Sequence, residues 1–570
     1  MEKPIAQSLL QRQRAPAVCR GFVALLVMTA VLRPGSLVAA AVTRSESVAK
    51  PAVSQGPDGR LSYAPDAFGN TVPDFALAGY RHGGVALPVA PVVATLKPLA
   101  GSEDDSARIQ AAIDRVAQAP ERTADGVRGA VLLLRGTYRC GTTLRVPAGV
   151  TLRGEGQDAA GTLIIATMRS LKEGGGPTLI NVGGAAKLPQ EKTAHAILDE
   201  VVPLGSRQMK VADAGSFKAG DLVTIERKAN QAWIHDLKMD QIVLHEGGKQ
   251  WNPKDYSRSW QARIVSVNGA LLALDTPVLC AVERCYGGGS VYKCLSDPRG
   301  RGAAVERVRL DSVYQAGQEN ADEDHAWTAI AMNGVVDAWV REVTALHFAY
   351  ACVGVGRNCA RITVQDCAML DSVSQITGGR RYSFSAGGQY VLFQRCYARH
   401  GRHDFVNGPN DMGPSVYLDC LAEQTHADIG PHHRWACGQL YDNVKGGQIH
   451  VQDRGGMGSG HGWAGNAQVF WNCEAPSLLC QKPGVPGAQN WALGCVGGKG
   501  RPALSGRLDG CWQNFGQHVT PRSLYLAQLK ERFDRAGGKG NEALQATTTP
   551  EQRQGTIWDY LHRRFSADRH

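Results

Sequence analysis

After residue 32 the chain has no apolar run long enough to form a membrane-spanning helix. The earlier run at 21–32 is itself too short to span a bilayer, and basic residues precede it. Small residues at 39–41 follow as a candidate cleavage site, and no Cys comes after them to carry a lipid anchor. We therefore predict an export signal over 1–41 and a secreted or periplasmic mature protein without a stable membrane span. The alternative is an uncleaved N-terminal anchor.

A strong charge of one sign is also absent. The 62 Lys and Arg residues exceed the 52 Asp and Glu residues by only ten, which gives a formal net charge of +10. Cleavage after residue 41 would remove five basic residues and one acidic residue and leave +6. A mildly basic chain without basic stripes interleaved with aromatic residues gives no support to nucleic-acid binding, but it suits an acidic partner.

The segment 305–500 repeats one short strand pattern every 22 to 29 residues. Each strand alternates apolar and polar residues and ends at a Cys or Val. Stacked about 4.8 Å apart, such strands form the coils of a solenoid. Their last residues would then form one interior ladder, which consists of Val343, Cys367, Cys396, Cys420, Val444, Cys473 and Cys495.

Cysteine is plentiful for an exported chain, with 15 residues, of which Cys19 lies in the signal. Strand neighbours on one ladder rarely offer disulfide geometry, so we interpret the five ladder cysteines as small apolar core side chains. The better disulfide candidates are Cys280, Cys285, Cys294, Cys352, Cys359, Cys437, Cys480 and Cys511.

A helix and several short strands precede the repeat. Ser102 or Asp104 can cap a helix at 102–118 with one apolar face, and strands with turns follow at 130–153. The runs DDSARIQAAIDRVAQ, GAVLLLRGTYRC and LRVPAGVTLRGEG resemble the start of the pectate-lyase-superfamily β-helix proteins over about 55 residues. The resemblance implies an all-β, single-stranded right-handed parallel β-helix whose open end is covered by a capping helix. It does not specify a reaction.

Changes in composition mark further boundaries. The stretch 42–100 is rich in Pro, Ala and Gly and is interpreted as an extended arm that packs along something larger or is partly flexible. Separate strands with a polar, Trp-containing stretch between them indicate an inserted β subdomain, and Thr520–Pro521 can begin a C-terminal helix as N-cap and first residue. The predicted segments are therefore the signal at 1–41, the arm at 42–100, the cap and first coils at 101–185, the inserted subdomain at 186–300, the main β-helix at 301–515 and the helical end at 516–570.

The repeat also brings the connecting loops into phase. Asp404 and Asp428 both lie eight residues past a ladder position, so we expect them to stack within about 5–6 Å on neighbouring coils. Neighbouring loop positions add histidines and arginines to the same side. The candidate catalytic residues are His403, Asp404, Asp428, His432, His433, Arg434 and His461, and the candidate substrate-binding residues are Arg380, Arg381, Arg402, Asn410, Arg454 and Trp463.

An elongated groove on a solenoid suits a linear polymer, and Arg and His side chains suit an anionic one. We therefore expect an acidic polysaccharide as the substrate. For a uronate polymer the natural reaction is β-elimination, in which a base takes the proton α to the carboxylate and cations stabilise the resulting charge. The base or acid would be His403, His433 or His461, because imidazole titrates near neutrality. The protein is thus predicted to be a polysaccharide lyase.

Arginine and aspartate complete this prediction. Arg381, Arg434 and Arg454 would neutralise the substrate carboxylate. Asp404 and Asp428 would orient a histidine, or they would bind Ca²⁺ as hard oxygen ligands. No other cofactor is expected, and no residue is assigned to a metal. His432 and His433 are adjacent, so in a strand they would point apart and form a poor chelating pair.

Two other functions compete with the lyase. Asp404 and Asp428 would serve an inverting glycoside hydrolase as acid and base. The string Gly460-His461-Gly462 resembles the Gly-His-Gly of polygalacturonases, but the Asn-Thr-Asp and Arg-Ile-Lys signatures of that family are missing around it. A β-helix that binds glycan without cleaving it is the third reading. The sequence does not indicate an oligomeric state.

Overall fold

Three stacks of strands build the body of the protein in the computed structural model, which describes residues 50–170 and 174–568. The first stack contains β7 (Val150–Gly156), β19 (Ala304–Ser312), β21 (Val335–Leu346), β23 (Ala360–Gln365), β26 (Gln389–Gln394), β29 (Met412–Glu423), β31 (Ala436–Lys445), β33 (Gly465–Trp471) and β35 (Trp491–Leu493). The second adds β5 (Gly136–Cys140), β8 (Thr162–Ala166), β24 (Ala368–Leu370), β27 (Tyr397–Arg399), β32 (Gln448–Val451), β34 (Glu474–Lys482) and β36 (Val496–Lys499). The third consists of β6 (Leu144–Val146), β9 (Thr178–Gly183), β20 (Thr328–Asn333), β22 (Ala351–Val355), β25 (Phe384–Ala386), β28 (Phe405–Asn407) and β30 (Gly430–Pro431).

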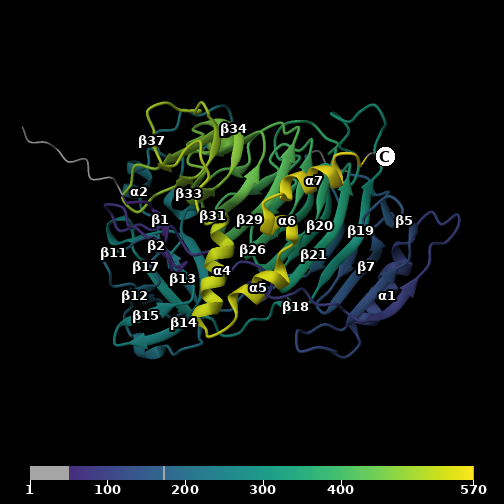
Figure 1. Ribbon diagram of the computed structural model, residues 1–570, viewed down its shortest axis with the longest axis horizontal. Helices are drawn as coiled ribbons and strands as arrows, with labels where there is room; N and C mark the ends of the chain where they lie inside the picture. Colours follow the sequence, from purple (N-terminus) through teal and green to yellow (C-terminus); the bar gives the residue numbers. More distant parts are fainter. Residues whose placement is uncertain (1–49, 171–173, 569–570) are drawn as a thin grey trace, which may run out of the picture. The chain divides into compact units, whose positions relative to one another are not determined.

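Strands of successive coils pair in parallel, and the coils follow one another along the solenoid (Figure 1). Long strands bend from the first stack into the second, so that β29 pairs with β26 in one stack and with β27 in the other. The protein is a right-handed parallel β-helix, which confirms the predicted fold class.

A residue in the left-handed backbone region precedes the ladder positions. Its φ is 57° at Asp366, 53° at Arg395, 55° at Asp419 and 50° at Asn472. Asp, Asn and Gly adopt this conformation more readily than other residues do. Before the last ladder position this place is taken by Gly494 with φ 70°, where a Cβ would lie 2.1 Å from the Asn472 Oδ1 atom. Each of these residues bends the strand at the corner between the first two stacks.

The predicted ladder is confirmed. Cys420 pairs directly with Val444, and the strand registers align the other ladder positions in the same way. All seven side chains are fully buried in the core of the solenoid. The fourteen described cysteines are free thiols, so the predicted disulfides are wrong for this part of the chain. Cys352, Cys359 and Cys480 instead fill the same core, and Cys285 is exposed.

The ends and edges of the solenoid are covered by the other predicted segments. Helix α1 (Ser106–Ala117) packs its buried face on the first coils, although its N-cap is Asp105 rather than Ser102 or Asp104. The arm at 50–100 contacts the solenoid instead of hanging free, since Phe75 and Ala78 are fully buried. The predicted signal at 1–41 and the arm residues 42–49 lie outside the described residues.

The inserted segment is a β subdomain, as predicted, and its strands pair antiparallel. Its strands are β10 (His195–Ala196), β12 (Gln208–Lys210), β13 (Leu222–Arg227), β14 (Arg258–Asn268), β15 (Leu271–Leu274) and β17 (Gly289–Lys293), with helix α2 (Gln231–Asp236) among them. It has a core of its own that also takes in Trp435, Cys437 and Trp463 of the solenoid. The subdomain is therefore docked firmly on one side of the coils.

Four helices follow the last coil and lie across the strands on the side of the solenoid: α4 (Leu524–Arg535), α5 (Gly540–Thr547), α6 (Pro550–Gln554) and α7 (Ile557–Phe565) (Figure 1). The first begins at Leu524 with Ser523 as its N-cap, so the predicted start at Thr520–Pro521 is wrong. The reason is that Asn472 donates hydrogen bonds to the carbonyl groups of Val519 and Arg522, and residues 520–522 form bends there instead of a helical turn. None of the helices in 50–170 and 174–568 is both long and apolar enough to cross a membrane.

The ladder predicts a stability effect. Replacing Cys396 with Leu adds volume to a filled core and is expected to cost about 1–3 kcal/mol. Thermal unfolding followed by circular dichroism should therefore show a lower midpoint for Cys396→Leu. The matched control is Cys285→Leu at an exposed position, which should leave the midpoint unchanged. Equal midpoints for the two variants would contradict the packing role of the ladder.

Candidate functional site

Four histidines meet beside the third stack. His403 precedes β28, whereas His432 and His433 follow β30. His461 follows the short helical turn α3 (Met457–Gly460) of the next coil. The ring centroid of His432 lies 4.4 Å from that of His403 and 5.0 Å from that of His461, and the rings of His433 and His461 are stacked at 4.5 Å. We call these four residues the histidine cluster.

His432 and His433 do not point apart, contrary to the expectation for neighbours in a strand. Strand β30 ends at Pro431, and the two residues that follow the histidines, Arg434 and Trp435, have φ of 58° and 64°. The two histidines therefore lie in a bend of the chain rather than in an extended segment. Their ring centroids are 4.8 Å apart and the ring planes are almost perpendicular.

The place of His461 is determined by the glycines on either side of it. A Cβ on Gly460 would lie 2.4 Å from the backbone oxygen of Lys249, and one on Gly462 would lie 2.7 Å from the ring of Trp251. Both contacts come from the inserted subdomain, which approaches the loop closely. The Gly-His-Gly string thus has a packing explanation, and the subdomain forms one side of the histidine cluster.

Asp428 forms a buried ion pair with Arg454 and also contacts His403 of the cluster. Its carboxylate accepts a hydrogen bond from Arg454 Nη2 and lies 3.3 Å from His403 Nδ1. Burial opposes ionisation of Asp428, but the charge of Arg454 and the hydrogen bond from His403 hold the pKa of this carboxyl well below its usual range. The same His403 nitrogen donates to the Asp428 carbonyl oxygen at 2.7 Å, because a carbonyl can only accept. His403 is therefore fixed in orientation, with Nε2 directed away from Asp428.

Two arginines at the cluster have no carboxylate to neutralise them. Arg434 donates to the backbone oxygen and hydroxyl of Ser459, and Arg402 donates to the backbone oxygen of Gly378. Within the described residues neither makes an ion pair with Asp or Glu. Both are half-buried, and together with Arg454 they contribute to the electrostatic environment of His461. The cluster therefore carries an excess of positive charge.

The three remaining rings of the cluster are uncharged at neutral pH. Burial, with the neighbouring His461 and arginine charges, lowers the pKa of His433 to about 3. Burial and the charges of Arg454 and Arg434 lower the pKa of His461 to about 4. Burial also lowers the pKa of His432 far below its ordinary value. Each ring can therefore bind a ligand through a nitrogen lone pair, although the lowered pKa makes it a weak proton acceptor.

Tyr382 belongs to this site, although the sequence analysis missed it. Its ring lies 5.0 Å from that of His403 and 5.3 Å from that of His432, in edge-on contacts. Burial raises the pKa of its hydroxyl, so the group stays protonated at neutral pH. A protonated phenol beside neutral imidazoles is a candidate proton donor.

Asp404 and Asp428 are in register on neighbouring coils, since Val406 pairs with Gly430, but they do not face a common groove. Asp404 is fully buried, and one of its oxygens accepts a hydrogen bond from the Ser383 hydroxyl at 2.6 Å. Burial raises the pKa of Asp404 to about 7. Because Asp428 is already neutralised by Arg454, the structure offers no pair of free carboxylates here for Ca²⁺ or for acid and base roles.

The other predicted residues are placed elsewhere. Arg380 pairs with Glu323 at 2.6 Å, and Arg381 donates to backbone oxygens such as that of Ser374 at 2.6 Å. Asn410 accepts a hydrogen bond from Arg258 of the inserted subdomain. Trp463 is buried in the subdomain core and has no exposed face for a sugar. These residues support the loops around the cluster.

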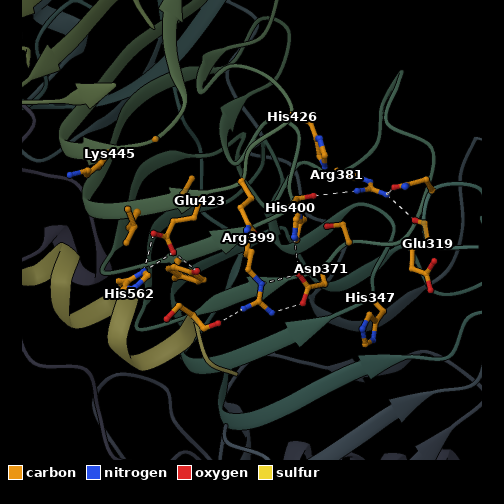
Figure 2. Close-up of a pocket in the computed structure, with 18 of the residues that line it drawn as sticks. Glu319, His347, Asp371, Arg381, Arg399, His400, Glu423, His426, Lys445 and His562 are labelled. Atoms are coloured by element: carbon orange, nitrogen blue, oxygen red, sulfur yellow. Dashed lines mark hydrogen bonds and ion pairs between the residues drawn. The ribbon is translucent and has the colours of Figure 1, made fainter. Parts of the chain in front are cut away.

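A cavity of about 1030 Å³ lies on the neighbouring side of the same loops (Figure 2). The loop at 400–404 contributes His400 to the cavity and His403 to the cluster, and the next loop contributes His426 to the cavity and Asp428 to the cluster. Figure 2 shows the ion pairs that line the cavity, in which Arg399 binds Asp371 and His562 lies 3.0 Å from Glu423. Arg399 and His562 are thus paired with carboxylates, unlike Arg402 and Arg434. Arg381 also lines the cavity and makes no ion pair among the described residues, but it is almost fully buried and donates to neutral backbone oxygens such as those of Glu319 and Ser374. Further lining residues that the sequence analysis missed are Tyr314, Glu319, His347 and Lys445.

Among known proteins, the chain resembles solved structures but matches no protein-family description and no curated protein sequence. The tailspike protein of Pseudomonas phage LKA1 is 14% identical with a TM-score of 0.39, over 69% of this chain and 56% of that one. An iota-carrageenase bound to iota-carrageenan fragments is 11% identical with a TM-score of 0.28, over 67% and 58%. The A-module of a mannuronan C-5 epimerase from Azotobacter vinelandii is 10% identical with a TM-score of 0.26, over 71% and 87%.

The chain thus spans little more than half the length of the phage tailspike. TM-scores below 0.5 at such low identity carry no information on activity. The function of this chain is therefore argued from its own residues.

The buried Asp404 predicts a pH dependence of stability. A carboxyl whose pKa is about 7 in the folded chain and about 3.9 when unfolded stabilises the fold fully below pH 4, and this contribution is lost as the pH rises to about 7. Asp404→Asn keeps an acceptor for Ser383 and cannot ionise. The melting temperature of the wild type relative to this variant should therefore fall between pH 4 and pH 7. A difference that stays constant over this range would contradict a raised pKa.

Proposed function

We propose that the histidine cluster and its arginines form the active site of a polysaccharide lyase that cleaves a uronate-containing chain by β-elimination. The observation that carries the proposal is the pair Arg402 and Arg434, two guanidinium groups without a carboxylate partner among the described residues, beside imidazoles that are neutral at pH 7. Arginine is suited to bind a planar carboxylate with two hydrogen bonds. An anionic sugar would supply the missing negative charge.

The reaction follows from these parts. When the substrate carboxylate lies between the arginines, its charge is neutralised and the proton on the adjacent carbon becomes more acidic. The proton acceptor is a ring nitrogen of His433 or His461, or a water molecule that these rings hold. The bound carboxylate offsets the arginine charges that lower the pKa of both rings, so their pKa rises and they become stronger bases when the substrate is in place. The electron pair left on carbon forms the double bond of the unsaturated product, and the glycosidic oxygen leaves. Tyr382 is the candidate that gives this oxygen a proton, because its hydroxyl stays protonated.

The location of Asp404 and Asp428 disfavours the hydrolase alternative. An inverting hydrolase needs two carboxyl groups about 6.5–9.5 Å apart on opposite sides of the scissile bond. Asp404 is fully buried, and Asp428 is held by Arg454 and His403. Export through the segment 1–41 is part of the same proposal, since a long acidic polysaccharide would be met outside the cytoplasm.

The chemistry can be tested with a panel of polyuronates and other acidic glycans. β-Elimination is expected to produce the ultraviolet absorbance of an unsaturated uronate together with new reducing ends, and product masses should be lower by one water than hydrolytic products. New reducing ends without that absorbance would identify a hydrolase and overturn the proposal. Binding of a glycan without any cleavage would overturn it in favour of a non-catalytic glycan-binding protein.

Substitutions at the cluster give a second prediction. Arg402→Gln and Arg434→Gln each remove one stabilising charge and should lower kcat/KM by about 10²–10³. His433→Ala and His461→Ala should abolish turnover. The control is Arg135→Gln, because Arg135 is 69% exposed on a coil near the other end of the solenoid and should retain full activity. Circular dichroism must show unchanged folding, and full activity of both histidine variants would place the active site elsewhere.

A further inference from the structure

We propose that His432, His433 and His461 form a binding site for one divalent transition-metal ion of the zinc class. One ring nitrogen from each residue lies within 4.8 Å of the others, which makes them the three-ligand group that the described residues offer for a metal ion. The three side chains come from two successive coils and are held by the bend after β30 and by the glycines that flank His461. A metal site was not predictable from the sequence, because adjacent histidines in a strand would point apart, whereas His432 and His433 lie in a bend.

The distances are close to those of a coordination site. A tetrahedral ion with nitrogen ligands at about 2.0–2.1 Å separates these nitrogens by about 3.4 Å. Each pair of nitrogens therefore has to approach by at most about 1.4 Å, which small rotations about the side-chain bonds supply. His433 and His461 are only partly buried, so their rings have room to rotate.

The ring nitrogens are also available as ligands. The Nδ1 atoms of all three residues are buried and have no hydrogen-bond partner among the described protein groups. A buried polar atom without a partner is costly, and a cation coordinated by it would remove that cost. His432 is only 6% exposed, so its nitrogen depends on a partner within the site.

The donor chemistry determines the class of ion. Three neutral imidazoles suit zinc, copper, iron or nickel ions, whereas Ca²⁺ prefers oxygen ligands. Three protein ligands leave at least one coordination position for water or a substrate atom, as in catalytic rather than structural zinc sites. With the ion bound, the ligand nitrogens would not be free to take a proton, and a water molecule at the open position would be the base of the proposed elimination. His403 is not one of the three ligands. Its ring packs against that of His432, and its hydrogen bond to Asp428 fixes its orientation.

Neighbouring charges oppose the cation and make its binding dependent on an anion. Arg402, Arg434 and Arg454 lie near the three rings, and Asp428 offsets only one of these charges. A carboxylate that binds the metal's open position and the arginines would relieve this repulsion. Metal and uronate should therefore each increase the affinity for the other, as linkage requires. This coupling rests on the proposed function, whereas the metal site itself does not.

The metal site can be tested on the full mature chain, prepared without a histidine tag and stripped with a chelator. Equilibrium dialysis against Zn²⁺ followed by elemental analysis should give one ion per chain, and Co²⁺ should give the visible absorption of a four-coordinate ion with nitrogen ligands. His432→Ala, His433→Ala and His461→Ala should each lower the affinity by about a hundredfold or more. His518→Ala, which removes a histidine that is 40% exposed and paired only with Glu474 in the described structure, should bind like the wild type.

Several outcomes would overturn the site. Occupancy far below one ion per chain would do so, and so would wild-type affinity in the His432→Ala and His461→Ala variants. Since His432 is buried and its loss can disturb folding, His433→Asn provides a second test at a partly exposed position, with folding checked by circular dichroism. A folded His433→Asn chain that binds Zn²⁺ as well as the wild type would also overturn it.

The two proposals fail separately. If the chain binds Zn²⁺ through these histidines but releases no unsaturated product from any polyuronate, the lyase is wrong and the metal site stands. If the chelator-treated chain binds no metal and still cleaves with full activity, the metal site is wrong and the lyase stands. The coupling is measured by titrating Zn²⁺ with and without galacturonate as the probe, and an unchanged affinity would remove the coupling alone.

Discussion

Parallel stacking of the coils in a fixed register is the constraint on which the rest of the structure depends. Each coil can stack on the next only if its corners coincide, and the left-handed residue before each ladder position determines where one corner falls. The ladder side chains then fill the core at the same height in every coil. Because the corners are fixed, the loops that leave them are also fixed, although they differ in length and sequence. The site is therefore a consequence of the register rather than of any single loop.

Within the site a buried ion pair organises groups that are themselves uncharged. Arg454 and Asp428 neutralise each other, and Asp428 determines the orientation of His403. A buried charge pair of this kind contributes little net stability, but it leaves the structure few alternatives, since breaking it exposes an uncompensated charge. The rigid pair thus supports a surface of neutral rings and unpaired guanidinium groups. Of the polar residues that the repeat brings into phase, Arg454 and Asp428 therefore hold the structure, whereas Arg402, Arg434 and the neutral rings are suited to bind a ligand.

The regular parts of this architecture were predictable from the sequence. The ladder from Val343 to Cys495, the helix near Ser106 and the inserted β subdomain follow from periodicity and strand patterns, which report local conformation and burial. Conformations imposed by distant contacts were not predictable. The start of α4 is shifted by hydrogen bonds from Asn472, and the bend at His432–His433 depends on two residues with positive φ that follow the pair. His562 joins the large cavity through a helix that lies outside the repeat, so no offset could place it there.

The loops that carry the histidine cluster also line the large cavity, and the difference in charge between the two sides separates their roles. In the cavity Arg399 and His562 are each matched by a carboxylate, so an incoming anion would have to compete with an existing partner. Arg381 has no such partner among the described residues, but it is buried and its donors are taken up by neutral protein oxygens. At the cluster Arg402 and Arg434 bind only neutral oxygens, and the rings beside them carry no charge. An anionic sugar therefore gains more electrostatic free energy at the cluster, where no ion pair has to be broken. Judged by volume alone, the cavity would be the better binding site. Volume measures only the room for a ligand, however, whereas unmatched charge measures the attraction that would hold an acidic one.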